Sequence, residues 1–141
     1  MEDKSKNIVL RLVGQHRTLQ SDLGIVAKEL AKTQISATVI SKALKTFTSD
    51  LGEHLRLEND YFYVELLKKM EAKGDDTENT KKFINEMAII GEAVKAFLNK
   101  YKEEAEIETG IGEFGSDFGS IVETLNIRIE AEESGVYMYW E

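Results

Sequence analysis

Hydrophobic residues recur along this chain in alternating steps of three and four, the spacing that places side chains on one face of an α-helix. The pattern predicts four helices, over about residues 6–32 and 36–73, from about residue 75 into the acidic segment 103–108, and over about residues 114–132. In the first helix, the row expected to face inward consists of Ile8, Leu12, His16, Leu19, Leu23, Val26 and Leu30. The rows follow a period close to 3.5 residues, which is typical of bundles with shallow crossing angles.

Cap and turn residues separate these helices. Ser36 is the expected N-cap of the second helix, and Gly74 is expected to end it in the left-handed conformation that glycine tolerates. Asp75 and Glu78 have the spacing of a capping box at the start of the third helix. Gly52 is the expected position of a bend in the long second helix. Three glycines predict a flexible connection, or a frayed start, before the fourth helix: Gly110, Gly112 and Gly115.

The composition agrees with a helical bundle. The 141 residues are 42% hydrophobic and 31% charged, which is a globular composition, and the chain is long enough to bury a core without a disulfide or metal staple. Proline is absent, as suits long uninterrupted helices. We therefore expect one all-α domain over residues 1–141, built as an antiparallel four-helix bundle.

Charge and cysteine usage exclude several classes of function. The net charge is −8 and the sequence has no basic stripe, so we expect no nucleic-acid binding. The absence of cysteine excludes disulfides, thiolate metal sites and cysteine nucleophiles. No apolar run suggests a signal peptide or a membrane span, so the cytoplasm is the expected location, without membrane association.

Polar residues interrupt the inward-facing rows where apolar residues would be expected. His16 does so in the first helix. His54 and Glu58 do so in the second, and Arg128 and Glu132 repeat the same four-residue spacing in the fourth. Each pair is followed by aromatic residues. Burying such groups is costly unless each is paired, hydrogen-bonded or bound to a metal.

Two interpretations follow from that cost. In the first, His16, His54, Glu58 and Glu132 form a metal site, because two imidazoles and two carboxylates suit iron, manganese or zinc with an open coordination position. In the second, the layer is a metal-free network in which Arg128 bridges both carboxylates as a bidentate fork and the histidines complete the hydrogen bonding.

The segment Leu51-Gly52-Glu53-His54-Leu55-Arg56-Leu57-Glu58, followed by Tyr61-Phe62-Tyr63, resembles the second helix of hemerythrin-like (HHE cation-binding) domains. The stretch 125–139 resembles the fourth helix of that family, and His16 fits its first histidine. The resemblance covers nearly the whole chain. It implies an up-down-up-down four-helix bundle with a non-haem di-iron centre that binds dioxygen or nitric oxide, or that senses iron or redox state.

The resemblance carries four ligands over to this chain, which are His16, His54, Glu58 and Glu132. Two further positions depart from the family, because Met87 and Arg128 stand where it has histidines. A thioether is a poor ligand for iron, and a fixed cation repels a second metal. We therefore expect a mononuclear or incomplete iron site, or no metal, in place of a complete di-iron pair.

These observations favour a sensor or regulatory protein with an altered non-haem metal site, and a metal-free interaction module is the alternative. A non-haem iron oxidoreductase ranks third. The sequence shows no catalytic nucleophile–base arrangement, so a histidine-based hydrolase is not expected. A protein partner is expected in the interaction reading, and the sequence fits either a monomer or a homodimer. The aromatic tail, Tyr137, Tyr139 and Trp140, is expected to pack against the end of the bundle.

Overall fold

The computed structural model describes residues 4–140, and these residues form helices and short connections without a strand. The helical elements in chain order are α1 (Lys4–Leu30), α2 (Ala37–Leu57), η1 (Glu58–Phe62), α3 (Tyr63–Ala72), α4 (Glu78–Lys100), α5 (Glu104–Thr109), α6 (Ile111–Ser134) and η2 (Val136–Trp140).

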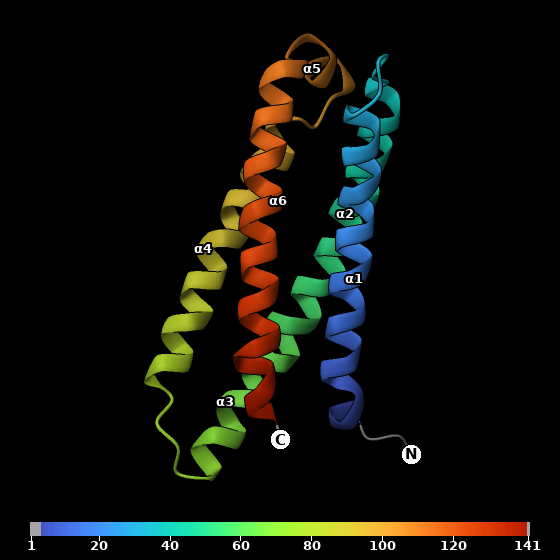
Figure 1. Cartoon of the computed structure of the whole chain (residues 1–141). Coiled ribbons are helices and arrows are strands. Elements are labelled where there is room, and N and C mark those ends of the chain that lie inside the picture. The colour runs from blue at the N-terminus through green and yellow to red at the C-terminus, as the bar shows by residue number, and fades with distance from the viewer. Residues whose placement is uncertain (1–3, 141) are drawn as a thin grey trace.

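Four long helical rods run side by side and alternate in direction (Figure 1). The second rod consists of α2, η1 and α3 in continuous succession, while α5 is a short helix in the connection between α4 and α6. The predicted up-down-up-down four-helix bundle is therefore confirmed. Among residues 4–140, no helix combines the length and the hydrophobicity needed to span a bilayer.

The helix ends match the predicted caps in part. Ser36 caps α2 by accepting a hydrogen bond from the backbone N–H of Val39. Gly74 has a φ of 79°, the left-handed conformation predicted for it. The capping box at Asp75 is wrong, because α4 begins at Glu78, whose backbone N–H donates to the Asp76 carboxylate at 2.9 Å.

The acidic segment and the glycines that follow it also differ from expectation. The glutamates do not extend the third rod, since they lie in or beside the separate helix α5, where Ile107 is buried. Helix α6 then begins at Ile111, directly after Gly110, so Gly112 and Gly115 are helical. The fourth rod is therefore longer at its start than the sequence pattern predicts.

The long second rod changes its geometry at a different place from the one predicted. Gly52 lies in regular α-helix, whereas residues 58–62 form a π-helical turn. The backbone N–H of Tyr63 donates to the carbonyl of Glu58 across this wider turn. A π turn accommodates one extra residue, and here the consecutive residues Phe62 and Tyr63 are both buried.

The core has two apolar parts. The larger one fills the end of the bundle near α5 and includes Phe47, Phe97 and Phe114. The smaller one lies near η1, α3 and η2 and contains aromatic side chains such as Phe62 and Trp140. The predicted polar residues of the inward-facing rows are also buried.

The aromatic tail folds back as the 3₁₀ helix η2. Gly135 permits this change of direction, since a Cβ atom there would lie 2.5 Å from the carbonyl oxygen of Ala131. Tyr137 and Trp140 are buried, as expected for a tail packed on the bundle, whereas Tyr139 is 56% exposed.

Candidate metal centre

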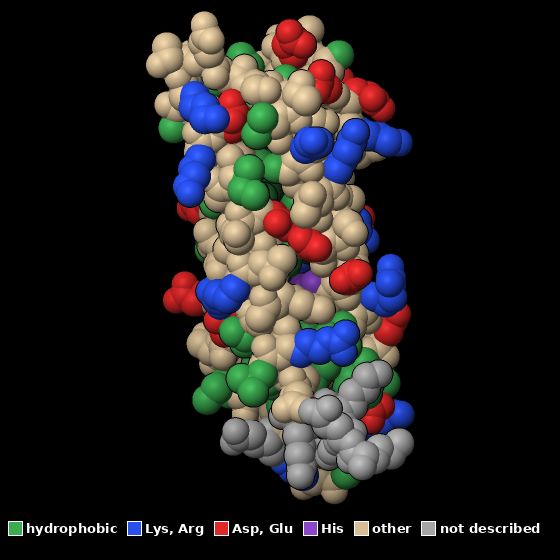
Figure 2. Space-filling view, turned by 90° about the vertical axis from the view of Figure 1, so that its right-hand side faces the viewer, with side chains coloured by type: hydrophobic (Ala, Val, Ile, Leu, Met, Phe, Trp, Pro, Cys, Tyr) green, Lys and Arg blue, Asp and Glu red, His purple; other side chains and the backbone are tan. Residues whose placement is uncertain are grey.

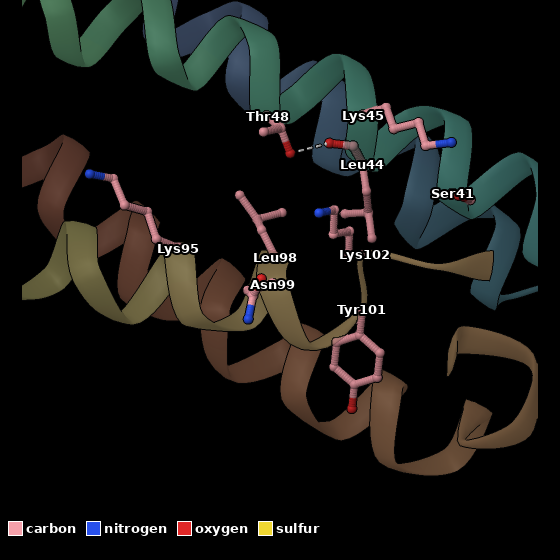
Figure 3. Close-up of a pocket in the computed structure, with 9 residues that line it drawn as sticks. All are labelled: Ser41, Leu44, Lys45, Thr48, Lys95, Leu98, Asn99, Tyr101 and Lys102. Carbon is pink, nitrogen blue, oxygen red and sulfur yellow. Dashed lines mark hydrogen bonds between the residues drawn. The ribbon is translucent and has the colours of Figure 1, made fainter. Parts of the chain in front are cut away.

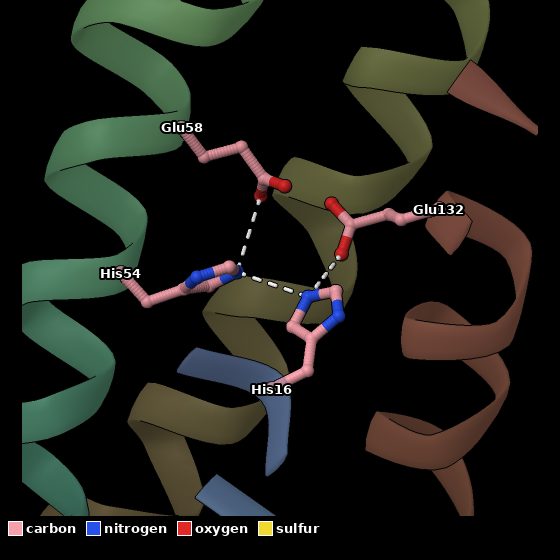
Figure 4. Close-up of side chains that lie close together, drawn as sticks. All are labelled: His16, His54, Glu58 and Glu132. Atoms are coloured by element: carbon pink, nitrogen blue, oxygen red, sulfur yellow. Dashed lines mark hydrogen bonds and ion pairs between the residues drawn. The ribbon is translucent and has the colours of Figure 1, made fainter. Parts of the chain in front are cut away.

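Four side chains from three rods meet in the core. His16 comes from α1, His54 from α2, Glu58 from the start of the π turn and Glu132 from α6 (Figure 4). One nitrogen or oxygen atom from each lies within 4.8 Å of the others. All four side chains are at most 2% exposed, and Figure 2 shows only a small edge of a histidine in an opening near the middle of one face. The structure therefore brings together every metal-ligand candidate predicted from the sequence.

The two histidines point their Nε2 atoms at each other, 3.1 Å apart. Their Nδ1 atoms point outward to acceptors. His16 Nδ1 lies 2.8 Å from Glu133 Oε2, and His54 Nδ1 lies 2.8 Å from Gln15 Oε1. A carboxylate and an amide oxygen can only accept, so both imidazoles carry a proton on Nδ1, and the Nε2 atom of each faces the centre. Burial, together with the neighbouring His16, lowers the pKa of His54 to about 3, so this ring is neutral at pH 7.

Two tyrosines hold the carboxylates of the centre. Tyr137 donates to Glu58 Oε2 at 2.6 Å, and Tyr63 donates to Glu132 Oε2 at 2.7 Å. The remaining oxygen of Glu132, Oε1, lies 3.2 Å from His16 Nε2 but has no hydrogen-bond donor among the described residues. This oxygen and the two Nε2 atoms therefore lie close together in the centre.

The two carboxyl groups titrate as a coupled pair. Burial raises the pKa of Glu58 well above its usual range, and repulsion from Glu132 raises it further. Burial also raises the pKa of Glu132, but the close polar contacts with His16 and Glu58, the charge of Arg128 and the hydrogen bond from Tyr63 outweigh it and lower the pKa to about 2. The pKa values of the two carboxyl groups are driven apart, because two ionised carboxylates so close together repel each other.

Arg128 occupies the side of the layer away from the histidines. Its Nη2 donates to Glu58 Oε1 at 2.8 Å and lies 3.5 Å from Glu132 Oε2. Its Nη1 donates to the backbone carbonyl of Met87 at 3.0 Å. The predicted bidentate fork is wrong, because one nitrogen serves both carboxylates while the other is used by α4. A glycine makes room for this arrangement, since a Cβ at Gly91 would lie 3.2 Å from Nη1.

The donor set fits one cation. Two ligand atoms bound to one metal at about 2.1 Å lie about 3.0–3.4 Å from each other, and the separations of 3.1 Å and 3.2 Å around His16 Nε2 match this. A second cation is disfavoured, because the guanidinium of Arg128 already contacts Glu58 and Met87 provides only a thioether on α4.

Several residues that shape the centre were not identified from the sequence. Gln15 directly precedes His16, and Glu133 directly follows Glu132. The helical pattern therefore places both residues beside the inward row and gives no sign of a role. Gly91 had a weak signal, as a glycine within a helix and away from any turn. The aromatic residues after each His/Arg–Glu pair were noticed, but the hydrogen bonds of Tyr63 and Tyr137 to the carboxylates were not predicted.

Comparison with known families agrees with this geometry. The family model for the hemerythrin HHE cation binding domain matches residues 7–140. Comparison with curated proteins and with solved structures gave no match. The match includes all four residues of the centre, and it covers the bundle from the first turns of α1 to the end of η2.

Proposed function

This chain belongs to the hemerythrin HHE cation-binding domain family, and from that premise we propose that it is a sensor or regulatory protein that holds a single non-haem iron ion. His16, His54, Glu58 and Glu132 would hold the ion. When bound, iron would supply a redox-active centre with affinity for dioxygen or nitric oxide. The observation that carries the proposal is the close approach of His54 Nε2 and Glu132 Oε1 to His16 Nε2, at 3.1 Å and 3.2 Å, within a buried group of four potential ligands.

The protein's own residues prepare this centre. Glu133 and Gln15 hold the imidazoles in the tautomer that presents Nε2, which is the usual arrangement around metal-binding histidines. Arg128 compensates part of the charge of the two carboxylates, so one bound metal cation is enough to balance the rest. The near-complete burial of the ligands excludes bulky substrates and favours small ligands.

The C-terminal turn provides a route by which the centre can affect the surface. Tyr137 contacts Glu58 and lies 3.2 Å from His16 Nε2, and it belongs to η2 together with Trp140. Trp140 packs on Phe62 with ring centroids 5.2 Å apart, and Lys69 lies over its ring. A change of charge at Glu58 alters the hydrogen bond from Tyr137 and therefore the packing of η2. This coupling supports a regulatory role.

The proposal is tested by metal content and by the emission of the single tryptophan. We expect protein purified without chelator, or loaded anaerobically with ferrous iron, to contain about one iron per chain, with absorption in air that the apo-protein lacks. His54→Ala should reduce the iron to near zero, whereas the exposed neighbour Glu53→Gln should retain it. Loading should shift the Trp140 emission maximum, and Tyr137→Phe should reduce this shift without loss of iron.

A second candidate is a metal-free interaction module. The ion pair between Arg128 and Glu58 at 2.8 Å favours it, because it provides a positive charge without a metal. Failure to bind iron, even after anaerobic addition, would contradict the sensor proposal and favour this alternative. Iron binding without any change at Trp140 would support the metal centre but contradict the coupling to η2.

A further inference from the structure

A groove of about 410 Å³ lies between α2 and α4, at the end of the bundle near α5 (Figure 3). Each helix contributes residues spaced as one helical face. The lining residues are Ser41, Leu44, Lys45 and Thr48 from α2, and Lys95, Leu98, Asn99, Tyr101 and Lys102 from α4 and the residues directly after it. Thr48 precedes His54 by six residues, about 9 Å along a helix, so the groove is separate from the metal centre.

The floor of the groove is apolar. Leu44 and Leu98 face each other across it, and the ring of Tyr101 extends the apolar surface. The tyrosine hydroxyl points away from the groove and donates to Asp117 at 2.6 Å. Apolar surface in a groove that a small ligand can fill contributes affinity in proportion to the area it buries.

Two lysines of the groove carry uncompensated positive charge. Lys45 and Lys102 make no ion pair or hydrogen bond with any residue in the described range 4–140, although the chain has a net charge of −8. The Lys102 side chain extends toward Leu44 and Leu98, and the Lys45 side chain extends along α2 toward Ser41 (Figure 3). Lys95 is paired with Glu92 at 3.6 Å. Lys45 and Lys102 therefore supply the unpaired positive charge of the groove.

A hydroxyl group also lines the groove. Ser41 is 6% exposed, and its side chain has no hydrogen-bond partner among residues 4–140. Thr48, by contrast, donates to the carbonyl of Leu44 at 2.7 Å. The Ser41 hydroxyl is therefore available to donate to a ligand in the groove.

We propose that this groove binds a free medium-chain monocarboxylate. The carboxylate lies at Lys45, Lys102 and Ser41, where an anion meets two ammonium groups and a hydroxyl donor. The hydrocarbon tail lies along Leu44 and Leu98 toward Thr48 and Lys95. The facing segments, 41–48 and 95–102, span eight residues each, about 10 Å. The volume is within the range of small-molecule sites, so the occupant is a small molecule and not a helix.

The test is calorimetric titration of the full chain with octanoate. We expect saturable binding of one octanoate per chain. The double variant Lys45→Gln/Lys102→Gln should weaken it at least tenfold, because it removes both positive charges and keeps the apolar floor. The matched control is Lys42→Gln, an exposed lysine on the same helix outside the groove, which should change the affinity less than twofold. Octyltrimethylammonium, with the same tail and the opposite charge, should not bind.

Four results would overturn the assignment. Equal binding of octanoate and octyltrimethylammonium would show apolar adsorption without a charge-specific site. Undiminished octanoate binding by the double variant would place the anion elsewhere. If octanoate does not bind and the protein forms a dimer that the double variant abolishes, the occupant is a second copy of the chain. If octanoate does not bind and the protein binds anionic phosphatidylglycerol vesicles in a way that the double variant abolishes, the occupant is a membrane. Iron content is independent of each of these readouts.

Discussion

Two pairs of acidic side chains lie in or beside the core of this bundle, and they are compensated differently. Glu58 and Glu132 face Arg128, which contacts both. Asp22 of α1 and Asp50 of α2 share a hydrogen bond, and no cation offsets their repulsion. Asp22 is 7% exposed, and its Oδ2 atom has no hydrogen-bond partner among the described residues.

The difference shows in the protonation of the two pairs. Burial, with the hydrogen bond to Asp50 and its negative charge, raises the pKa of Asp22 to about 7. Near Arg128, by contrast, Glu132 keeps a pKa of about 2 although it is more deeply buried. In both pairs burial raises the pKa of one carboxyl group. In the pair beside Arg128 the other carboxylate, Glu132, is held ionised by its contacts with His16 and Glu58 and by the charge of Arg128. The surrounding polar and charged groups therefore separate a candidate metal site from a buried acid pair.

Removal of the cation is expected to have the largest effect. Arg128→Ala should lower the free energy of unfolding of the metal-free protein by about 3–5 kcal/mol, because it leaves the buried carboxyl pair without its partner. Urea unfolding at pH 7 measures this, with the exposed Arg11→Ala as a control expected to change stability by less than about 0.5 kcal/mol. A loss as small as that of the control would show that Tyr63 and Tyr137 compensate the carboxyl pair alone.

The acid pair gives a smaller effect that depends on pH. The folded-state pKa of Asp22 is raised, so its contribution to stability is fully present below about pH 4 and is lost as the pH rises through about 7. Asp22→Asn stays neutral and should therefore exceed the wild type in stability by about 2 kcal/mol at pH 8, with almost no difference at pH 4. Thermal unfolding across this pH range measures it, and exposed Asp60→Asn is the control. A difference that does not vary with pH would mean that the pKa of Asp22 is the same in the folded and unfolded states.

The sequence predicted the four rods and the inward direction of the four candidate ligands because both depend on local helical periodicity. His16, His54, Glu58 and Glu132 each fall on an inward-facing row, and the family resemblance added that they lie at one level of the bundle, where the structure brings them together. The prediction failed where the position of a residue depends on a neighbouring helix. Asp22 lies beside the inward row of α1, and its burial follows from the approach of α2. The direction of the Arg128 side chain depends likewise on the space that α4 leaves.

The π turn was missed for a related reason. Its one extra residue brings Tyr63 beneath Glu58, where it donates to Glu132. A helical pattern extended regularly from His54 predicts Glu58 on the inward row but gives no reason for Phe62 and Tyr63 both to be buried. A wider turn at this point follows from the packing of η2 and α6 against the same segment, which local spacing does not encode.

The smallest effect tests how closely α4 is fitted to the arginine. Alanine normally stabilises a helix interior by about 1 kcal/mol relative to glycine, but a Cβ at Gly91 would press on Arg128 Nη1 at 3.2 Å. In the wild-type background, Gly91→Ala should therefore raise the free energy of unfolding only slightly, or lower it. In the Arg128→Lys background, where the charge is kept and the crowded nitrogen is absent, Gly91→Ala should raise the free energy of unfolding by about 1 kcal/mol.

The two substitutions together form a double-mutant cycle in urea unfolding, with an expected coupling of about 1 kcal/mol. Gly119 of α6 provides the control, because a Cβ there meets no atom within 4 Å, so its replacement by alanine should stabilise both backgrounds equally. Additive effects at Gly91 would mean that the guanidinium can shift without cost. In that case Arg128 would be less closely fitted than its contacts with Met87 and Glu58 indicate, and its side of the layer would be open to a second cation.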